Sequence, residues 1–571
     1  MDGRRPQLVR IRPPSICLTP NGGPFSRCPD EGKSVDLHFA SAWELVADTV
    51  PDSEAVIQGD RRLTWRDYEA AASRFAGAIE AAGVGSGSKV SLYLWNCPEY
   101  LIAHFGTFKN ECCPINVNYR YLDDELVYLV ENSDSEILVF HSSLGDRVAR
   151  VMDKLPNVKA FVEVDDGGDH VEGSVVWADF IRAEPQPRRD RDPESRYMLY
   201  TGGTTGMPKG VMYENNAFVG GLYSQYEALG LPVPIPTSLD MVPAFSKFVH
   251  DLARIVSVPC CPLMHGTGMW VGAMPAHLTG GAVVLLEGRS FDANELLDLT
   301  EREGVTRQVI VGDAFARPIA KALEERAAAG TLPDVSTVGQ VISSGAMWSA
   351  EIKQIMTTHM DAILLDALGS TEGGGYGAVT TDKSGGASTA KFQLADDTLI
   401  IDEDGNVIPR GSGGTGLLCS NTAARGYYKD PEKSAATFRE IEGGWYVITG
   451  DWATHEEDGT ITLHGRGSNC INSGGEKIYP EEVEEAMKTH ADIDDCYVIG
   501  IPDERFGNRI VAVAGCTTAA QPSEDELRTH LRGKISGYKI PKQIFLVGDF
   551  RRAPNGKADY GWAKEVAEQN A

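Results

Sequence analysis

The stretch NELLDLTEREGVTRQVIVGD (residues 294–313) decides the fold class, because an amphipathic helical segment leads directly into a short apolar run. The same succession follows twice more, in ARPIAKALEERAAA (316–329), VGQVISS (338–344), SAEIKQIMTTH (349–359) and AILLDA (362–367). Regular alternation of helical and strand segments is typical of a mostly parallel sheet covered by helices. We therefore predict an α/β fold of doubly wound sheets, with ligands held by the loops at the strand ends.

The alternation extends towards the N-terminus as far as residue 36. VSLYLWN (90–96) predicts a strand, and Thr64 with Asp67 three residues later is close to a capping box at the start of the preceding helix. Residues 1–35 contain several arginines and prolines but lack the apolar stretch of a secretory signal. We predict a disordered N-terminal extension there, and an Arg-rich organelle presequence is the alternative.

The longest uncharged stretch, residues 255–286, is long enough to raise the question of a membrane span. Prolines and glycines interrupt it repeatedly, which a lipid-exposed backbone would not tolerate, so we predict buried core and pocket wall instead of a span. The formal net charge of -28 argues against binding to nucleic acid or to an anionic membrane surface. Eleven cysteines without C-x-x-C spacing indicate a reducing, cytoplasmic location.

Two changes in pattern divide the C-terminal part of the chain. From about residue 393, short alternating runs with D-G and G-S-G-G turns predict a small antiparallel β subdomain. A polar, Gly-rich link at residues 465–476 leads to Pro480 at a helix start, followed by the strand candidates YVIGIP, VAVAGC and IFLVGD. We therefore predict an extension over residues 1–35, a large domain over 36–467 and a hinged α+β lid domain over 468–571.

A phosphate-binding loop is predicted in MLYTGGTTGMPKG (198–210), where an apolar strand precedes a loop rich in glycine and threonine. Glycine lets backbone N–H groups approach phosphate oxygens, the hydroxyls add donors, and the lysine offsets negative charge. It is not a Walker A loop, because a glycine follows the lysine. The candidate phosphate ligands are Thr201, Gly202, Gly203, Thr204, Thr205, Gly206 and Lys209.

The string YTGGTTGMPKG resembles the signature loop of adenylate-forming enzymes, the superfamily of acyl-CoA synthetases, firefly luciferase and peptide-synthetase adenylation domains. Four further segments resemble motifs of that superfamily in order and spacing. They are the adenine and magnesium motif LGSTEGG (368–374), the ribose motif WYVITGDWATHEEDG (445–459), the hinge GRGSNCINSGGEKIYPEEVE (465–484) and the catalytic-lysine loop PNGKADY (554–560). The resemblance covers residues 36 to about 565.

The resemblance implies a role for each motif residue. Glu372 would hold Mg2+, a hard cation that prefers oxygen ligands, and Asp451 would accept hydrogen bonds from both ribose hydroxyls. Lys557 would neutralise the charge that develops when a carboxylate attacks the α-phosphate, with Thr204 and Glu372 completing the catalytic set. The other implied ATP or AMP contacts outside the phosphate loop are Gly345, Ala346, Gly369, Ser370, Thr371 and Arg466.

The resemblance further implies two half-reactions in two lid orientations. Lys557 would leave the site after adenylation, and Gly474, Gly475 and Lys477 would then line a tunnel for CoA. The hinge commonly reads G-R-x-K-D in relatives, whereas Ser468 and Asn469 fill the last two places here. Asn tolerates unusual backbone angles, so Asn469 should still permit pivoting. Leu368 stands where relatives carry an aromatic residue against the adenine, so apolar contact would replace stacking.

Candidate acyl-pocket residues lie between the phosphate loop and the adenine motif: His265, Trp270, Phe315, Gly345 and Met347. Ordinary core packing is the alternative for each aromatic or apolar member, and a hydrogen-bonded core residue is the alternative for the histidine. No acidic residue is evident where amino-acid-activating relatives bind the substrate amine. VGDAFARP (311–318) and CINSGGEKIYPEEVEEA (470–486) resemble actinobacterial acyl-CoA synthetases for sterol side chains and fatty acids, which favours a fatty or steroid acid.

The predicted activity is therefore ATP- and Mg2+-dependent ligation of a small hydrophobic carboxylic acid to CoA, with no nucleic-acid partner and with a homodimer possible. Two other readings stay open. One is an adenylating enzyme of another type, which loads a carrier protein or reacts with oxygen as luciferase does. The other is a non-catalytic nucleotide-binding protein of the same fold, disfavoured because Glu372, Asp451, Arg466 and Lys557 are all present.

Overall fold

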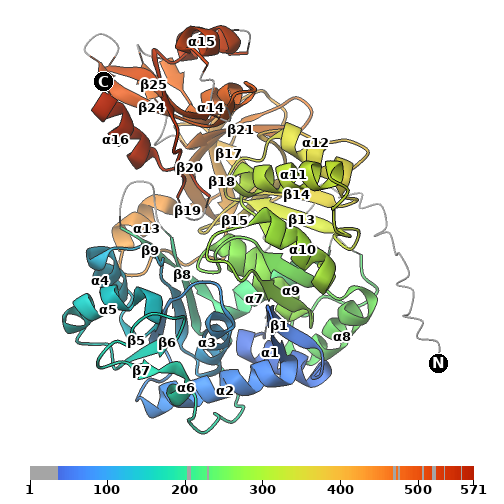
Figure 1. The fold of residues 1–571 in the computed structure, drawn as a ribbon, viewed down its shortest axis with the longest axis vertical. Coiled ribbons are helices and arrows are strands. Elements are labelled where there is room, and N and C mark those ends of the chain that lie inside the picture. The colour runs from blue at the N-terminus through green and yellow to red at the C-terminus, as the bar shows by residue number, and fades with distance from the viewer. Residues whose placement is uncertain are drawn as a thin grey trace.

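Two β-sheets covered by helices form the larger part of the protein in this computed structural model (Figure 1). The structure describes residues 36–201, 207–227, 230–466, 471–473, 476–503, 507–516, 522–532, 534–535, 537–553 and 556–570. The predictions for residues 1–35 and for the hinge at Asn469 lie outside these ranges.

The longer sheet changes from parallel to antiparallel pairing along its width. In spatial order its strands are β2 (Arg61–Thr64), β1 (Glu54–Gln58), β11 (Ala282–Leu285), β10 (Val256–Pro259), β12 (Arg307–Ile310), β13 (Gln340–Ser344), β14 (Ile363–Ser370), β15 (Gly374–Thr381), β16 (Lys391–Leu394), β21 (Thr460–Arg466), β20 (Gly444–His455), β18 (Thr415–Asn421) and β17 (Thr398–Ile401), with β19 (Phe438–Ile441) paired to β20. Pairing is parallel from β1 to β14 and antiparallel from β14 to β17.

Helices α10 (Ala293–Glu303), α11 (Gly312–Ala328) and α12 (Ala350–His359) share a buried apolar cluster with the parallel strands β10 to β14. Their bounds agree with the helices predicted from the alternating pattern, except that α11 begins at Gly312 instead of residue 316. The strands between them are parallel neighbours, as that pattern predicted. The α/β fold class is therefore confirmed.

The shorter sheet is wholly parallel and has the order β4 (Cys113–Asn116), β3 (Lys89–Tyr93), β5 (Ser135–His141), β6 (Ala160–Val164) and β7 (Val175–Val176). Helices α2 (Trp65–Ala81) and α3 (Pro98–Lys109) pack on each other and connect the sheets, because α2 contacts β1 and α3 contacts β3. Helices α4 (Asp123–Asn132), α5 (Gly145–Val151) and α6 (Trp177–Phe180) also contact this sheet, and α1 (Phe39–Thr49) packs against α2 and α3.

The start of α2 is the capping box that the sequence predicted. The Asp67 N–H donates to Thr64 Oγ1 at 3.1 Å, and the Thr64 N–H donates to Asp67 Oδ2 at 3.1 Å. Two otherwise unpaired backbone donors of the first turn are thereby satisfied. This helix end is set by local sequence alone.

Residues 255–286 form buried structure, as predicted. They contain β10, a π-helical segment Thr267–Ala273, α9 (Met274–Leu278) and β11, and most of their side chains are buried. Among the described residues, no helix combines the length and apolar character that crossing a membrane requires. Helices α7 (Asn215–Ser224) and α8 (Val242–Ala253) pack in the same region.

The antiparallel strands from residue 391 onwards were predicted as a subdomain, and the structure joins them to the longer sheet. The link is β15, which pairs with β14 on one side and with β16 on the other. The reversal between β14 and β15 falls within the predicted adenine and magnesium motif. The continuous sheet therefore places that motif between the parallel and antiparallel halves.

The C-terminal elements gather at the top of Figure 1, in orange and red. Strands β24 (Ile493–Asp503) and β25 (Gly507–Cys516) are antiparallel, and β26 (Gln543–Val547) is parallel to β25. Two apolar clusters hold these C-terminal elements together, and they include side chains of α14 (Pro480–Lys488), α15 (Glu524–Arg532) and α16 (Tyr560–Asn570). A separate pair of short strands is formed by β22 (Ile471–Ser473) and β23 (Glu476–Ile478). Pro480 occupies the first turn of α14, and all three predicted strands are present.

Two histidines are buried in the core formed by α1, α2, α3 and α9. Burial lowers the pKa of His104 to about 3 and that of His277 to about 4. His277 Nε2 lies 3.0 Å from the carbonyl oxygen of Ala55, and its ring packs edge-on against Trp65. Both imidazoles are therefore neutral in the folded protein at pH values where the unfolded chain, with a histidine pKa of about 6.5, takes up protons.

The free energy of unfolding is expected to fall as the pH is lowered from about 6.5 towards 4, because protons then bind the unfolded state preferentially. Each such histidine contributes about 1.4 kcal/mol per pH unit in this window. Replacing His277 by Gln should narrow the difference in unfolding free energy between pH 7.5 and 5.5 by about 1.4 kcal/mol. Urea unfolding followed by tryptophan fluorescence measures this, and an unchanged difference in the variant would contradict the assignment.

Candidate active site

The turn that joins β14 to β15 carries Thr371 and Glu372, and distant side chains fix its backbone. The Tyr213 hydroxyl donates to the Thr371 carbonyl, and Thr422 Oγ1 donates to the Glu372 carbonyl at 2.6 Å. Tyr213 is on β9 (Lys209–Glu214), and Thr422 immediately follows β18. Two distant chain segments therefore hold this turn in place.

Glycine and serine complete the turn. A Cβ atom on Gly369 would lie 2.3 Å from the Gly374 carbonyl oxygen, so a larger residue would force the strands apart. The Gly373 N–H donates to Ser370 Oγ at 3.0 Å. Gly369 and Ser370, both predicted as nucleotide contacts, thus have structural reasons for their identity in addition to any role with a ligand.

The Glu372 carboxylate is oriented by the Tyr427 hydroxyl, which donates to Oε1 at 2.9 Å. Among the described residues, no group of three or more His, Cys, Asp or Glu side chains could hold a metal ion. Mg2+ is commonly bound by one or two carboxylates while substrate phosphates and water supply the other ligands. A single oriented carboxylate such as Glu372 fits that mode of binding.

Lys209 lies close to Tyr427, the residue whose hydroxyl donates to Glu372. Its Nζ atom is 3.4 Å from Asp430 Oδ2 and 5.6 Å from the centre of the Tyr427 ring. Lys209 begins β9 and pairs with Thr201 at the end of β8 (Arg196–Thr201), so the two strands hold the ends of the predicted phosphate loop together. Its residues Gly202, Gly203, Thr204, Thr205 and Gly206 lie outside the described residues.

A chain of hydroxyl groups connects the adenine motif to Asp451. Ser370 Oγ lies 2.9 Å from the Tyr376 hydroxyl, which lies 3.1 Å from Thr449 Oγ1. Thr449 Oγ1 in turn donates to Asp451 Oδ2. Arg466 pairs with Asp451 across β20 and β21. The structure thus brings together the predicted adenine, ribose and Arg466 positions, which are separated by up to a hundred residues in sequence.

The lid residue Lys557 reaches the large domain at Gly345. A Cβ atom on Gly345 would lie 3.5 Å from Lys557 Cε and 3.7 Å from Thr267 Oγ1. Gly345 has φ +94°, a backbone conformation that favours glycine. Two predicted site residues that are far apart in sequence are therefore neighbours, and the Lys557 side chain lies against the Gly345 backbone.

The backbone after Gly345 is held against the start of α11. The Asp313 N–H donates to the Met347 carbonyl at 2.9 Å. A Cβ atom on Gly312 would lie 2.3 Å from the Met347 carbonyl oxygen and 2.9 Å from that of Ala346. The close approach requires glycine at position 312, whose φ is +52°. It fixes Ala346 and Met347 through their main chains.

The loop that carries Lys557 docks on the same helix. Gly556 has φ +75°, and a Cβ atom there would lie 3.1 Å from Phe315 Cε2 and 3.2 Å from the Ala314 Cβ atom. Phe315 also packs edge-on against Phe291, with ring centres 5.0 Å apart. Phe315, predicted in the acyl pocket, therefore contacts the lid loop.

His265 is partly buried, and the Lys557 charge acts on it. Burial, and secondarily the Lys557 charge, lowers the pKa of His265 to about 3, so the imidazole is neutral near pH 7. Its Nε2 atom is buried without a hydrogen-bond partner among the described residues. His265, which was predicted in the acyl pocket, thus adds no second positive charge beside the lysine.

Trp270 belongs to an aromatic cluster behind the Thr371–Glu372 turn. Its indole N–H donates to the Tyr197 hydroxyl at 2.6 Å, and its ring centre lies 4.7 Å from that of Phe218 and 5.8 Å from that of Tyr213. Tyr213 is the residue that binds the Thr371 carbonyl. This arrangement gives Trp270 the packed surroundings of a core residue next to the site.

Sequence reasoning missed five residues that support the site. They are Tyr213, Tyr376, Thr422, Tyr427 and Thr449. Only Thr449 carried a local signal, because it stands two residues before Asp451, a spacing at which a hydroxyl can reach a carboxylate. Of the predicted CoA contacts, Lys477 is in β23, whereas Gly474 and Gly475 lie outside the described residues.

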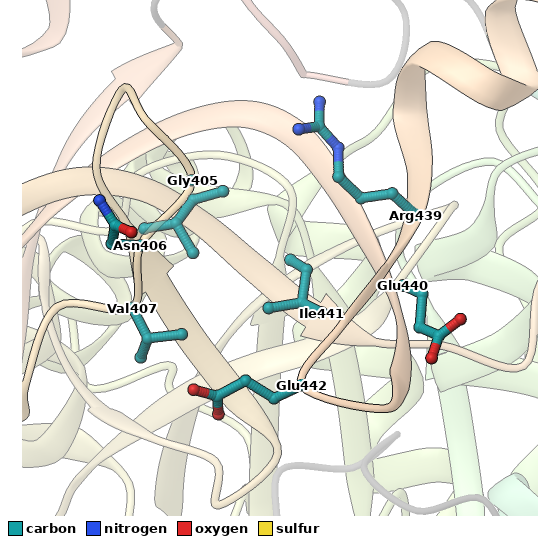
Figure 2. A pocket seen from close by; sticks show the side chains of 8 residues that line it. Gly405, Asn406, Val407, Arg439, Glu440, Ile441 and Glu442 are labelled. Carbon is teal, nitrogen blue, oxygen red and sulfur yellow. The ribbon is translucent and has the colours of Figure 1, made fainter.

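A separate cavity of about 530 Å3 lies on the antiparallel half of the longer sheet (Figure 2). It is lined by Ile401, Gly405, Asn406, Val407, Arg439, Glu440, Ile441 and Glu442. None of the predicted site residues is in this lining. Polar and charged groups dominate the rim, so this cavity is not the acyl pocket.

Comparison with protein families matches the AMP-binding enzyme family over residues 43–428 and the AMP-binding enzyme C-terminal domain over residues 482–557. Among solved structures, the anthranilate CoA ligase AuaEII in complex with anthranoyl-AMP superposes with a TM-score of 0.78 at 21% identity, covering 94% of this chain and 98% of that one. ATP-bound MatB from Rhodopseudomonas palustris gives 0.74 at 22% identity, covering 93% and 99%. These likenesses show the fold.

Two curated relatives are more similar in sequence. The medium/long-chain-fatty-acid–CoA/3-oxocholest-4-en-26-oate–CoA ligase of Mycolicibacterium smegmatis is 37% identical, over 93% of this chain and 97% of its own length. The 3-oxocholest-4-en-26-oate–CoA ligase of Rhodococcus rhodochrous is 38% identical, over 93% and 96%. The chain therefore belongs to the AMP-binding enzyme family and is one of its AMP-forming acyl-CoA ligases.

Proposed function

We propose that the protein joins a medium- or long-chain fatty acid, or a steroid side-chain carboxylate, to CoA in two steps. In the first, a carboxylate oxygen attacks the α-phosphorus of ATP, the bond to pyrophosphate breaks, and an acyl-adenylate forms. In the second, the CoA thiol attacks the acyl carbon, AMP leaves, and the thiol proton passes to solvent. The observation that carries the proposal is the placement of Lys557 against Gly345 in a chain with ligase relatives.

Residues of the large domain would hold the nucleotide. Asp451 would accept hydrogen bonds from the ribose hydroxyls, kept in position by Thr449. Glu372 would hold Mg2+, which offsets phosphate charge when bound, and Lys209 would add a positive charge from the phosphate loop. The Lys557 ammonium would stabilise the charge that develops during attack, since a cation placed there acts mainly on the transition state.

The apolar surroundings of the site support an uncharged acyl chain. His265 is neutral and partly buried, and Trp270, Phe218 and Tyr213 form the aromatic cluster behind the turn. Burying a charged substrate group among such side chains without a partner would be costly. The names of the two curated relatives supply the two classes of acid, fatty and steroid.

The test is carboxylate-dependent release of AMP and pyrophosphate by the purified full-length protein with ATP, Mg2+ and CoA. Thioester products should be screened over saturated fatty acids of increasing length, a steroid side-chain acid and benzoate. The expected result is thioester formation with one or both hydrophobic classes and little with benzoate. Release of ADP, or acyl transfer only to a phosphopantetheinyl carrier protein, would overturn the proposal.

Replacing Tyr427 by Phe should raise the Mg2+ concentration needed for half-maximal adenylation roughly 10-fold, because a hydrogen bond to a charged group contributes about 1.5–3 kcal/mol. The Glu372 carboxylate would then lose the donor that orients it. Pyrophosphate exchange measured across a Mg2+ titration reports the effect.

Tyr428→Phe is the matched control for Tyr427→Phe. Its hydroxyl donates instead to Asp134 Oδ2 at 2.7 Å, on a different part of the molecule, so its Mg2+ dependence should equal that of the wild type. Equal Mg2+ dependence of all three proteins would show that Tyr427 does not orient a metal ligand.

A further inference from the structure

A small turn in the lid presents Lys557 to the large domain. The Gly556 N–H donates to the Ala553 carbonyl at 2.8 Å, and the Ala553 N–H donates to the Lys557 carbonyl at 3.0 Å. These bonds close the turn on itself, but neither ties it to the rest of the lid. The position of the Lys557 ammonium depends on how that connection is made, because the lysine projects from the end of this turn.

The Arg552 side chain connects this turn to strand β24 of the lid. The Arg552 guanidinium donates to the Gly556 carbonyl at 2.9 Å through one terminal nitrogen. Its other nitrogens bind both oxygens of Asp495, with Nη2 at 2.7 Å from Oδ1. Asp495 is on β24, the lid strand that pairs with β25, and its Oδ1 also accepts from the Cys496 N–H at 2.9 Å. Arg552 thus bridges a rigid strand and the residue next to Lys557.

The surroundings hold Arg552 in this geometry. The guanidinium carbon lies 5.7 Å from the centre of the buried Tyr497 ring, two residues along the same face of β24 from Asp495. The Tyr497 hydroxyl donates to the Arg551 carbonyl at 2.9 Å, which fixes the chain immediately before Arg552. A planar guanidinium can bind a carboxylate with two donors and a carbonyl with a third, whereas a lysine ammonium cannot reproduce that fork.

We propose that Arg552 is a positioning residue for adenylation, which acts through Lys557 by clamping the lysine-bearing turn to Asp495. Arg552 contacts Asp495, Tyr497 and Gly556, all of which belong to the lid. When the lid leaves the adenylation site, the clamp travels with it and has no part in thioester formation. The inference rests on the proposed function, because it assumes that Lys557 serves the first half-reaction.

The test compares the two half-reactions in the full-length protein. Arg552→Gln should lower carboxylate-dependent pyrophosphate exchange roughly 10- to 100-fold, since small displacements of a catalytic group are costly. Thioester formation from a synthetic acyl-adenylate and CoA should stay within about twofold of the wild type. Arg552→Lys, which keeps the charge, should show the same selective loss, and Asp495→Asn a smaller one.

A neighbouring arginine provides the matched control. Arg551 is largely exposed and pairs with Asp549, at 3.0 Å, away from the turn. Arg551→Gln should therefore leave both half-reactions unchanged. Thermal unfolding of each variant checks that the lid still folds. If Arg552→Gln does not fold, Arg552→Lys still tests the proposal.

The decisive measurement is a double substitution with Lys557→Ala. If Arg552 acts only through the lysine, adding Arg552→Gln to Lys557→Ala should reduce pyrophosphate exchange no further. A further loss in the double variant, or equal losses in both half-reactions of Arg552→Gln, would overturn the inference. If Lys557→Ala alone leaves adenylation intact, the proposed role of the lysine fails first. If Lys557→Ala is defective in adenylation and both Arg552 variants are normal, the inference about Arg552 is wrong while the proposed role of Lys557 stands.

Discussion

Replacing Lys557 by Ala is expected to slow adenylate formation roughly 100- to 1,000-fold, the effect of removing one preorganised group from developing charge. Attack of a carboxylate on a phosphate brings two anions together, so a cation at that point stabilises the transition state more than the ground state. The structure places Lys557 Cε beside Gly345, 3.5 Å from the position that a Cβ atom on Gly345 would take. The nearby His265 is neutral, so it does not place a second positive charge beside the Lys557 ammonium.

Thioester formation from a preformed acyl-adenylate should be spared in the same variant. The bond between the α- and β-phosphates has already been broken in that substrate, so the thiol attacks the acyl carbon and no anion has to approach the α-phosphorus. Pyrophosphate exchange measures the first half-reaction, and single-turnover conversion of synthetic acyl-adenylate with CoA measures the second. The ratio of the two losses is the informative quantity, because a general loss of folding would reduce both.

Lys564→Ala is the control for this substitution. Lys564 is on α16 of the same lid, and its side chain is 56% exposed and 4.0 Å from Glu568. Removing its charge should affect neither half-reaction. Equal losses in both half-reactions of Lys557→Ala would show that the lysine does more than serve adenylation and would refute the two-orientation mechanism.

The sequence predicted the fold closely where local patterns determine it. The capping box of Thr64 and Asp67, the helices α10 and α12 and the parallel order of β12, β13 and β14 all follow from periodicity and end signals. The union of the antiparallel strands with the longer sheet did not follow. It depends on β15 pairing with strands on both sides, a tertiary choice that no local pattern records.

The sequence likewise indicated some residues of the candidate site and not others. Motif resemblance indicated Glu372, Asp451 and Lys557, but not the hydroxyl groups that orient the two carboxylates. Tyr427 is 55 positions from Glu372, and Tyr376 is 73 positions from Thr449. A tyrosine whose partner is that distant in sequence has no periodicity or spacing to distinguish it from a core tyrosine. Supporting residues of this kind become visible only once the chain is folded.

The loop that carries Lys557 fits closely against α11. Gly556 has φ +75°, and a Cβ atom on it would lie 3.1 Å from Phe315 Cε2. A branched side chain there would meet both a backbone conformation that β-branched residues rarely adopt and a buried ring. Replacing Gly556 by Val should therefore slow adenylation roughly 100-fold, although Lys557 itself is unchanged.

Gly548→Val is the matched control, because a Cβ atom on Gly548 would have no neighbour within 4 Å. It should leave both half-reactions intact, whereas Gly556→Val should impair pyrophosphate exchange far more than thioester formation. Phe315→Ala added to Gly556→Val should restore part of the adenylation rate by removing the ring that the valine meets. If the added substitution restores nothing, the defect comes from the strained turn itself, and docking of Gly556 on α11 would not be what limits adenylation.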